Sequence, residues 1–285
     1  MGFYIFKMKF SETIVDFQEI LDSMPRPIGL VPTMGFLHEG HLALIRKAVR
    51  ENKTVVTSIF VNPSQFSQGE DFKEYPRDID SDLKLLASEG VDVVFAPSIE
   101  EMYPNGFDTY INVGNVSMKL EGEHRLNHFD GVATIVCKLF NISNPDKAYF
   151  GKKDAQQCAV IEKLNADLNL GVKIELVETV RDKDGLALSS RNVHLTKAER
   201  LSALSINQAL FSAVSVWRSG IKSSNHLVNV VREILERDTM LDIDYVSIVD
   251  PKTFNILETV VDGSMICTAV HVGQIRLIDN AIFHK

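Results

Sequence analysis

Two histidines three residues apart, in VPTMGFLHEGH (31–41), are the first side chains whose spacing suggests chemistry. They stand at the expected start of a helix, after a strand and a tight turn at Gly35, and Gly40 between them permits close backbone approach. His38 and His41 can donate hydrogen bonds to a phosphate, which the exposed N–H groups and dipole of a helix N-terminus also favour. We therefore predict a phosphate site here. Two unrelated histidines in a surface loop, or a metal pair, are the alternatives, although a zinc-protease helix needs H-E-x-x-H.

Amide side chains follow the next apolar run, in FVNPSQF (60–66). Ligands of open α/β sheets bind beyond the carboxyl ends of the strands, so Asn62 and Gln65 can face a shared crevice. Amides donate and accept hydrogen bonds without adding charge, which suits a small hydroxy acid or an amine. The same Asn-Pro-Ser sequence is also ordinary turn chemistry, which is the alternative interpretation.

A third polar region extends from EGEHRLNHFDGV to YFGKKDAQQ (121–157). Its first half carries a polar cluster ahead of a buried helix, made of His124, Arg125 and His128. Its second half is a strand-to-helix turn (151–154), where Lys153 can meet a phosphate and Asp154 a ribose hydroxyl. Gln157 lies one turn further along the same helix. A solvated turn in which the aspartate caps the helix is the alternative.

A fourth segment, VRDKDGLALSSRN (180–192), is a polar loop between two structural regions. Its two hydroxyls and the arginine that follows can clamp a departing polyphosphate. Because a loop at a domain junction is free to move, its closure can exclude water from a hydrolysable intermediate. A flexible linker with a cap for the next helix is the alternative.

The elements that must position these segments alternate between strand and helix up to residue 180. Short β-rich runs are predicted at 28–32, 54–61, 91–97, 147–151 and 173–180, with helices at about 41–52, 77–89, 131–143 and 155–168. This alternation implies a parallel sheet covered on both faces, and hence a Rossmann-like domain over residues 1–180.

The pattern changes in the remaining residues, 181–285, which we predict to form a smaller α+β domain. Two helical stretches are expected at 197–218 and 224–237, followed by strands at 244–250, 265–272 and 275–279. The boundary between the two domains is placed at residues 178–186.

Composition limits the possible functions. The 285 residues are 45% hydrophobic and 24% charged, which is ordinary for a folded α/β protein. The net charge is −8 and the basic residues are scattered, which argues against nucleic acid as a partner. A few placed Lys or Arg side chains and helix N-termini can still bind ATP locally.

Cysteine usage and the N-terminal residues favour a cytoplasmic protein. The apolar start (1–10) is short and interrupted by two lysines, so we predict neither a signal peptide nor a membrane span. The cysteines are interpreted as reduced thiols, because their number is odd and their spacing unpaired; they are Cys137, Cys158 and Cys267.

Five motifs taken together resemble one known family. In chain order, PTMGxLHxGH, FVNPxQF, EGxxRxxHFxGV, FGKKDxQQ and GLAxSSRN are similar to the pantothenate synthetases, or pantoate-β-alanine ligases. The resemblance runs from about Ile28 to the C-terminal RLIDN, and it places HEGH as the signature of the HIGH-type nucleotidyl transferases. It implies that pantoate and ATP form a pantoyl-adenylate and pyrophosphate, after which the amine of β-alanine displaces AMP.

The resemblance also implies roles for individual residues. His41 is the expected proton donor, and the other residues implied in catalysis are His38, Lys153, Ser189, Ser190 and Arg191. The implied ATP site comprises Met34, Gly35, His38, Gly40, His41, Gly151, Lys152, Lys153, Asp154, Val180, Leu188, Ser189, Ser190 and Arg191. The implied substrate residues are Gln65 for both pantoate and β-alanine, Gln157 for pantoate, and Asn62, Arg125 and His128 as secondary candidates.

Magnesium is expected on the triphosphate, held largely by phosphate oxygens, with no protein ligand assigned. A homodimer is expected by the same resemblance. Placement at a helix N-terminus disfavours the imidazolium form of the two histidines, while a bound polyphosphate opposes that effect, so their resting charge stays open.

Three positions differ from the family pattern. Leu126 stands where R-P-x-H is common, Leu188 where methionine or lysine is often found, and Phe36 where a smaller residue is usual. None of them removes a predicted polar site residue. We therefore expect effects on affinity or rate rather than on the reaction.

Two rival functions would use some of the same residues. Another adenylyl- or cytidylyltransferase would carry a phosphate-bearing acceptor, which calls for Arg or Lys where Gln65 and Gln157 stand. A catalytically silent nucleotide-binding regulator would be favoured by loss of a motif histidine or of Lys153, yet these residues are present.

Overall fold

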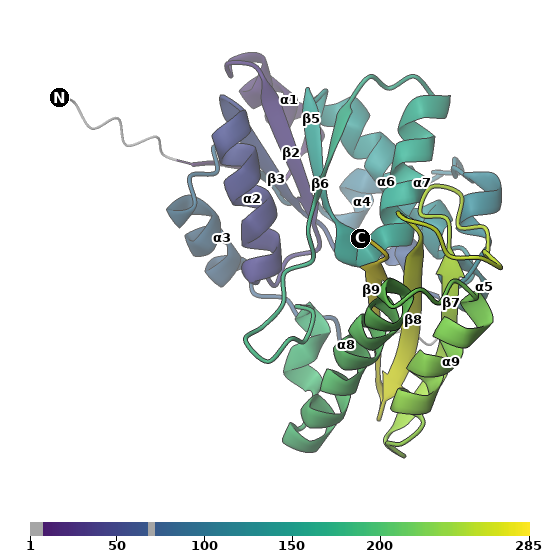
Figure 1. Cartoon of the computed structure of the whole chain (residues 1–285). Coiled ribbons are helices and arrows are strands. Elements are labelled where there is room, and N and C mark those ends of the chain that lie inside the picture. Colours follow the sequence, from purple (N-terminus) through teal and green to yellow (C-terminus); the bar gives the residue numbers. More distant parts are fainter. Residues whose placement is uncertain (1–7, 68–71) are drawn as a thin grey trace.

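The larger part of the molecule is a six-stranded parallel sheet (Figure 1). The computed structural model describes residues 8–67 and 72–285. The prediction for residues 1–10 therefore falls mostly on residues 1–7, which lie outside the described part. In the order β1-β4-β3-β2-β5-β6, the strands are β1 (Lys9–Ser11), β4 (Val93–Phe95), β3 (Thr54–Ile59), β2 (Ile28–Thr33), β5 (Lys147–Gly151) and β6 (Lys173–Val177).

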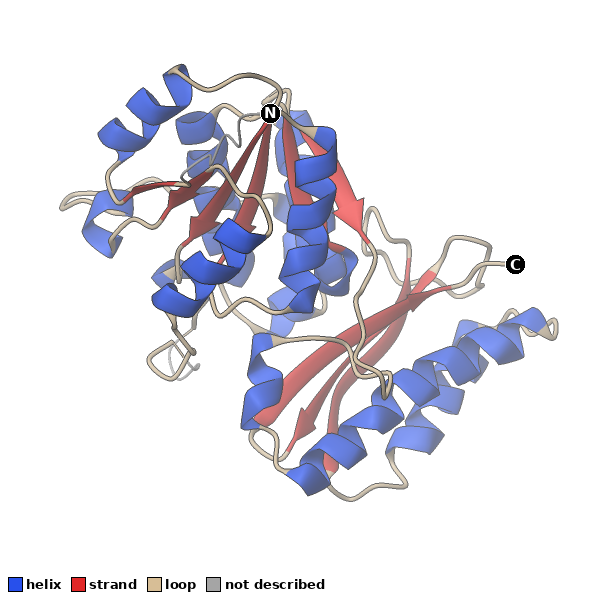
Figure 2. Ribbon diagram, turned by 90° about the vertical axis from the view of Figure 1, so that its left-hand side faces the viewer, coloured by secondary structure: helices blue, strands red, loops and turns tan. Residues whose placement is uncertain are grey.

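Helices cover both faces of this sheet, because successive strand residues point to opposite sides. Leu30 and Val56 pack with α1, α6 and α7, whereas Val31 and Val55 pack with α2 and α3. Figure 2 shows the resulting layers. The helices of this part are α1 (Ile14–Asp22), α2 (Glu39–Glu51), α3 (Ile79–Ser88), α4 (Ile99–Met102), α5 (Glu121–His124), α6 (His128–Ser143) and α7 (Ala155–Asp167).

The rest of the chain forms a smaller α+β unit. Its antiparallel strands, in the order β7-β8-β9, pack one face against α8 and α9. From the opposite face, Met265 and Cys267 enter the core of the larger sheet, so the two parts share buried surface. The elements are α8 (Lys197–Arg218), α9 (Ser224–Leu235), β7 (Leu241–Val249), β8 (Met265–Val272) and β9 (Ile275–Ile282).

The predicted fold class is confirmed, with differences at some element ends. The strand predicted to reach residue 180 ends at Val177, because the next residues leave the sheet and run along a cavity. The helix predicted from residue 131 begins at His128. β1 and α1 have no counterpart among the predicted elements. For β1 the reason is its length, since a three-residue edge strand leaves little periodic signal.

The strand order reverses between β2 and β5, and the carboxyl ends of these two strands flank the place where a ligand is expected to bind.

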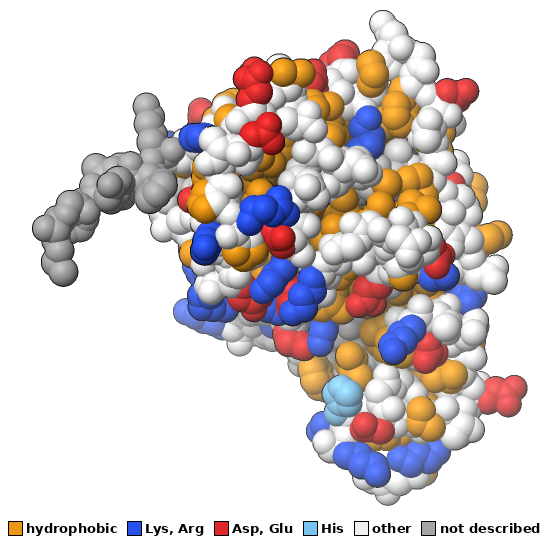
Figure 3. All heavy atoms as spheres, turned by 90° about the horizontal axis from the view of Figure 1, so that it is seen from above, with side chains coloured by type: hydrophobic (Ala, Val, Ile, Leu, Met, Phe, Trp, Pro, Cys, Tyr) orange, Lys and Arg blue, Asp and Glu red, His pale blue; other side chains and the backbone are white. Residues whose placement is uncertain are grey.

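We keep the division into residues 1–180 and 181–285 as a proposal, supported by the change from a parallel to an antiparallel sheet. On the face seen in Figure 3, basic and acidic side chains are interspersed, as the scattered charges in the sequence suggest.

Candidate active site

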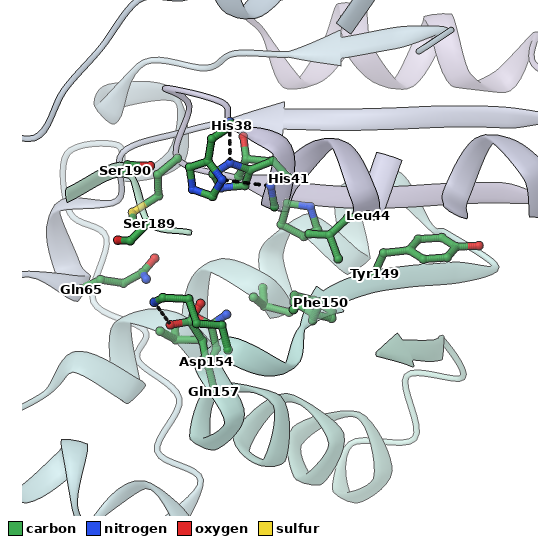
Figure 4. Close-up of a pocket in the computed structure, with 18 of the residues that line it drawn as sticks. His38, His41, Leu44, Gln65, Tyr149, Phe150, Asp154, Gln157, Ser189 and Ser190 are labelled. Carbon is green, nitrogen blue, oxygen red and sulfur yellow. Dashed lines mark hydrogen bonds and ion pairs between the residues drawn. The ribbon is translucent and has the colours of Figure 1, made fainter. Parts of the chain in front are cut away.

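A cavity of about 240 Å³ lies at this reversal of strand order. Its walls come from distant parts of the sequence: the histidine turn, the amide turn, α6 with the residues before it, the turn after β5 and the loop before α8. Sixteen of the predicted site residues line it: Met34, His38, Gly40, His41, Gln65, Arg125, His128, Gly151, Lys153, Asp154, Gln157, Val180, Leu188, Ser189, Ser190 and Arg191. Figure 4 shows His38 and His41 on one side, with Asp154 and Gln157 facing them.

The side chains of the two histidines together cap the N-terminus of α2, each accepting one backbone N–H hydrogen bond. His38 is the N-cap residue, and its Nδ1 accepts a hydrogen bond from the Gly40 N–H at 3.1 Å. His41 Nδ1 accepts from the His38 N–H at 3.3 Å. This is a capping box built from imidazoles in place of the usual hydroxyl and carboxylate. Because both Nδ1 atoms accept, each neutral ring carries its proton on Nε2 and can donate it to a ligand.

Burial keeps both rings neutral. It lowers the pKa of His41 to about 3, with the neighbouring His38 adding to the effect. Burial also lowers the pKa of His38 to about 4, assisted by the positive charge of Lys153 and opposed by Asp154. The ring centroids lie 4.1 Å apart, too close for two positive charges in a partly buried site. The histidines are therefore neutral hydrogen-bond donors near pH 7.

A buried carboxylate that sequence reasoning did not identify holds the histidine turn. Asp82 is 2% exposed, and its two oxygens accept from the N–H groups of Phe36 at 2.8 Å and Leu37 at 2.7 Å. The turn needs this support, because Phe36 has a left-handed φ of 52°. Gly35 lies behind the cavity wall, with a φ of 79°, and a Cβ there would approach Asp82 to 3.0 Å.

Of the two predicted residues in the amide turn, one lines the cavity and the other holds it from behind. Gln65, in the 3-10 turn η1 (Pro63–Gln65), lines the cavity. Asn62 is 1% exposed and lies behind it, donating from Nδ2 to Gln65 Oε1 at 2.9 Å and to the Gly131 carbonyl at 3.1 Å. Since Gln65 Oε1 accepts from Asn62, its Nε2 is left to face a ligand. A Cβ at Gly131 would overlap the carbonyl oxygen of Ser64, so α6 approaches η1 as closely as glycine permits.

Of the three residues in the predicted polar cluster ahead of α6, two line the cavity and one does not. His128 Nδ1 lies 2.7 Å from the carbonyl oxygen of Gln65, and Arg125 Nη1 lies 3.1 Å from His128 Nε2. Both of these residues line the cavity. His124 instead pairs with Asp244 at 2.7 Å, in the smaller unit of the molecule.

The turn after β5 brings a lysine and an aspartate to the cavity. Lys153 Nζ lies 3.2 Å from Asp154 Oδ1, in the 3-10 turn η3 (Lys152–Asp154). Asn280 of β9 donates to the carbonyls of Lys152 and Lys153 at 2.9 and 3.0 Å, so the smaller unit braces this turn. Lys152 does not line the cavity, and its side chain pairs with Glu178, which does.

The loop before α8 closes over the histidine turn. Leu188 N–H donates to the Val180 carbonyl at 3.0 Å, which joins the first residue of the predicted clamp to a residue predicted to bind the nucleotide. Ser190 Oγ donates to the Phe36 carbonyl at 3.3 Å, and the Arg191 guanidinium lies 5.7 Å from the centre of the Tyr75 ring. The predicted phosphate clamp and the predicted phosphate turn are therefore neighbours.

A second ionic group missed by the sequence reasoning joins the two parts of the molecule beside the cavity. Glu121 is 5% exposed and accepts two hydrogen bonds from Arg276, at 2.7 and 2.8 Å, and one from the Tyr245 hydroxyl at 2.8 Å. Burial opposes its ionisation, yet Arg276 and Tyr245 hold the pKa of Glu121 below its ordinary value. These partners are far apart in sequence, and no local pattern indicates them.

Within residues 8–67 and 72–285, no group of three or more His, Cys, Asp or Glu side chains is arranged to hold a metal ion. Among the helices of those residues, none combines the length and apolar character that crossing a membrane requires.

Comparisons with known proteins identify similar chains. A family model described as pantoate-beta-alanine ligase matches residues 9–282. The pantothenate synthetase of Roseiflexus castenholzii is 47% identical over 275 residues, covering 96% of this chain and 99% of that protein. The pantothenate synthetase of Aquifex aeolicus is 51% identical over 256 residues, covering 90% of each.

Two crystal structures of similar proteins share the fold. The pantothenate synthetase of Thermus thermophilus has a TM-score of 0.94 and 42% identity, over 98% of this chain and 100% of its own. The pantoate-beta-alanine ligase of Francisella tularensis, in complex with beta-gamma ATP and beta-alanine, has a TM-score of 0.81 and 34% identity, over 97% and 98%.

Proposed function

Because the chain belongs to the pantoate-β-alanine ligase family, we propose that the cavity between β2 and β5 is its active site. The enzyme condenses pantoate with β-alanine at the expense of ATP. The pantoate carboxylate attacks the α-phosphorus of ATP and expels pyrophosphate, and the amine of β-alanine then attacks the acyl carbon and releases AMP. Both steps depend on positioning and on charge stabilisation.

The histidine turn carries the proposal. His41 and His38, each with its proton on Nε2, donate to phosphate oxygens as negative charge builds up during attack on phosphorus. The neighbouring N–H groups of α2 add the positive end of the helix dipole. Lys153 adds a positive charge on the facing wall, so the phosphates lie between the two walls.

Other residues hold the remaining parts of the reactants. Asp154 accepts from a ribose hydroxyl, and the backbone at Gly151 and Val180 borders the nucleotide. Gln65 Nε2 donates to pantoate and later to β-alanine, and Gln157 holds pantoate from α7. Ser189, Ser190 and Arg191 bind the departing pyrophosphate, since they stand against the histidine turn. Asn62 and Asp82 act as positioning residues, through Gln65 and the histidine turn respectively.

A protein nucleophile has no role in this scheme. The thiol nearest the site, Cys158, donates to the Gly151 carbonyl at 3.3 Å, and burial raises its pKa well above the ordinary value.

Magnesium would neutralise the triphosphate charge. We propose that this ion is held largely by phosphate oxygens. We also propose that the protein is a homodimer and that it acts in the cytoplasm. Light scattering on the purified protein measures its oligomeric state.

Exchange of labelled pyrophosphate into ATP tests the first half-reaction alone. With pantoate, magnesium and no β-alanine, the wild-type protein should catalyse this exchange. His41→Gln retains a side chain that can accept from the His38 N–H, yet it should lower the exchange rate by about 100-fold or more. Exchange without pantoate, or an unchanged rate in His41→Gln, would contradict the proposed roles.

A further inference from the structure

The turn that carries Lys153 is held by one side chain of the smaller unit. Asn280, on β9, is 9% exposed, and its Nδ2 donates to the carbonyl oxygens of Lys152 at 2.9 Å and Lys153 at 3.0 Å. Asp154 begins α7 without a side-chain cap, and its carboxylate pairs with Lys153 instead. Asn280 does not itself line the cavity. Its amide uses both N–H bonds on two consecutive carbonyls, which fixes the orientation of both peptide planes.

The neighbouring residue anchors β9. Asp279 is 5% exposed and accepts two hydrogen bonds from the Arg181 guanidinium, at 2.6 and 2.9 Å, which is the bidentate geometry of a strong ion pair. Its Oδ1 also accepts from the Asn280 N–H at 2.8 Å. Arg181 directly follows Val180, which lines the cavity. Two consecutive residues of β9 therefore hold two separate segments of the cavity wall.

The geometry of a strand explains how neighbouring residues can do this, since their side chains point to opposite faces of the sheet. Asn280 pairs in register with Cys267 of β8, which lies in the core of the larger sheet, so Asn280 faces the larger unit. Asp279 faces the other way, toward α8. Arg181 lies on that side, with its guanidinium 5.5 Å from the centre of the Phe211 ring of α8. One strand thus connects the lysine turn to the loop before α8.

An accurately placed backbone matters for a lysine that acts on phosphate. The ammonium group is a compact charge on a flexible four-carbon stem, so only its backbone gives it a fixed origin. Stabilisation of a developing negative charge depends on groups that are already in place. A displacement of about 1 Å can cost about 100-fold in rate.

We propose that Asn280 is a positioning residue of the ligase: it fixes the backbone from which Lys153 reaches the phosphates of ATP. Asp279 keeps β9 in place for this task through its ion pair with Arg181. The inference rests on the proposed function. It adds a residue of the smaller unit that acts through Lys153.

A double-mutant cycle in ATP affinity tests this role. The Kd for ATP is measured by titration calorimetry, which needs no turnover, in wild type, Asn280→Ala, Lys153→Met and the double variant. Asn280→Ala should weaken ATP binding about tenfold in the wild-type background, and by less than about twofold where Lys153 is already methionine, because residues that act together are not additive. The rate of pyrophosphate exchange should also fall about tenfold in Asn280→Ala.

Asn255→Ala is the matched control. Asn255 also joins the two units, since its Oδ1 accepts from Lys119 Nζ, but it is exposed and does not line the cavity. This variant should keep the wild-type ATP affinity and exchange rate. Urea unfolding without substrates checks that each variant is folded.

Two results would overturn the inference while leaving the ligase function intact. Equal losses of ATP affinity in both backgrounds would show that Asn280 supports the fold and not Lys153, and an unchanged affinity in Asn280→Ala would deny it any role. If Lys153→Met leaves ATP affinity unchanged, the inference fails together with the role of Lys153.

Should Asn280→Ala fail to fold, Asn280→Ser takes its place in the same cycle, with the same expected factors. Its hydroxyl fills part of the space but is too short to reach both carbonyls. Absence of pantoate-dependent turnover in the wild-type protein would instead refute the proposed function itself.

Discussion

The neutral histidine pair makes stability depend on pH in a way that one substitution should remove. Burial lowers the folded-state pKa of His41 to about 3, below the ordinary value of 6.5. The unfolded chain therefore binds a proton more readily than the folded one at intermediate pH. The stability that results from a neutral His41 is complete above the ordinary pKa and is lost as pH falls towards 3.

The size of the effect follows from the two pKa values. At about pH 5 the unfolded His41 is mostly protonated and the folded one is not, which removes about 2 kcal/mol of stability relative to about pH 7.5. His41→Gln abolishes this contribution. Glutamine at the third position of a helix can still accept from the N-cap N–H, so the local cap is retained. The contribution of His38 remains in the variant, so its stability still declines, but less steeply.

Urea unfolding at 25 °C over this pH range measures the difference. Wild type should lose about 2 kcal/mol more than His41→Gln on acidification. His226→Gln serves as the matched control, because His226 is exposed on α9, and it should follow the wild-type curve. Parallel curves for wild type and His41→Gln would show that His41 is already charged in the folded protein, which would refute the neutral-donor assignment.

Three further substitutions test the supports of the site, each by urea unfolding and steady-state kinetics. Gly131→Ala places a methyl group against the Ser64 carbonyl, so we expect a loss of about 1–3 kcal/mol and a higher KM for pantoate. Asp82→Asn can accept only one of the two turn N–H bonds and should cost about 2 kcal/mol and raise the KM for ATP. Arg276→Met leaves Glu121 buried and unpaired, at a cost of about 3–5 kcal/mol that an added Glu121→Gln should partly restore. Wild-type stability and kinetics in any of them would contradict the corresponding contact.

Most of the motifs follow a strand, and the carboxyl ends of parallel strands meet at one edge of a sheet, so the sequence predicts that these segments lie close together. His41, Gln65, Asp154 and Ser190, each from a different predicted segment, line one cavity, and their roles there stay predictions. The alternation of strand and helix patterns was sufficient to predict the fold class. Buried strands and long amphipathic helices leave strong periodic signals.

The supports of the site could not be predicted in the same way. Asp82 holds a turn 46 residues away, and Glu121 meets Arg276 across 155 residues. Asp82 stands among several acidic residues at the start of α3, and nothing local distinguishes the buried one from the exposed ones. Such contacts depend on how helices and strands pack against one another, and the periodicity of the sequence carries no information on that packing.

Steady-state turnover with each substrate omitted in turn tests the central claim most directly. With ATP, magnesium, pantoate and β-alanine, the purified protein should release AMP and pyrophosphate in equal amounts over many turnovers. Omission of pantoate should abolish both products, and omission of β-alanine should limit pyrophosphate release to about one equivalent per site. AMP and pyrophosphate formation that ignores either acid, with ATP still bound, would contradict the assignment of this cavity as a pantoate-β-alanine ligase site.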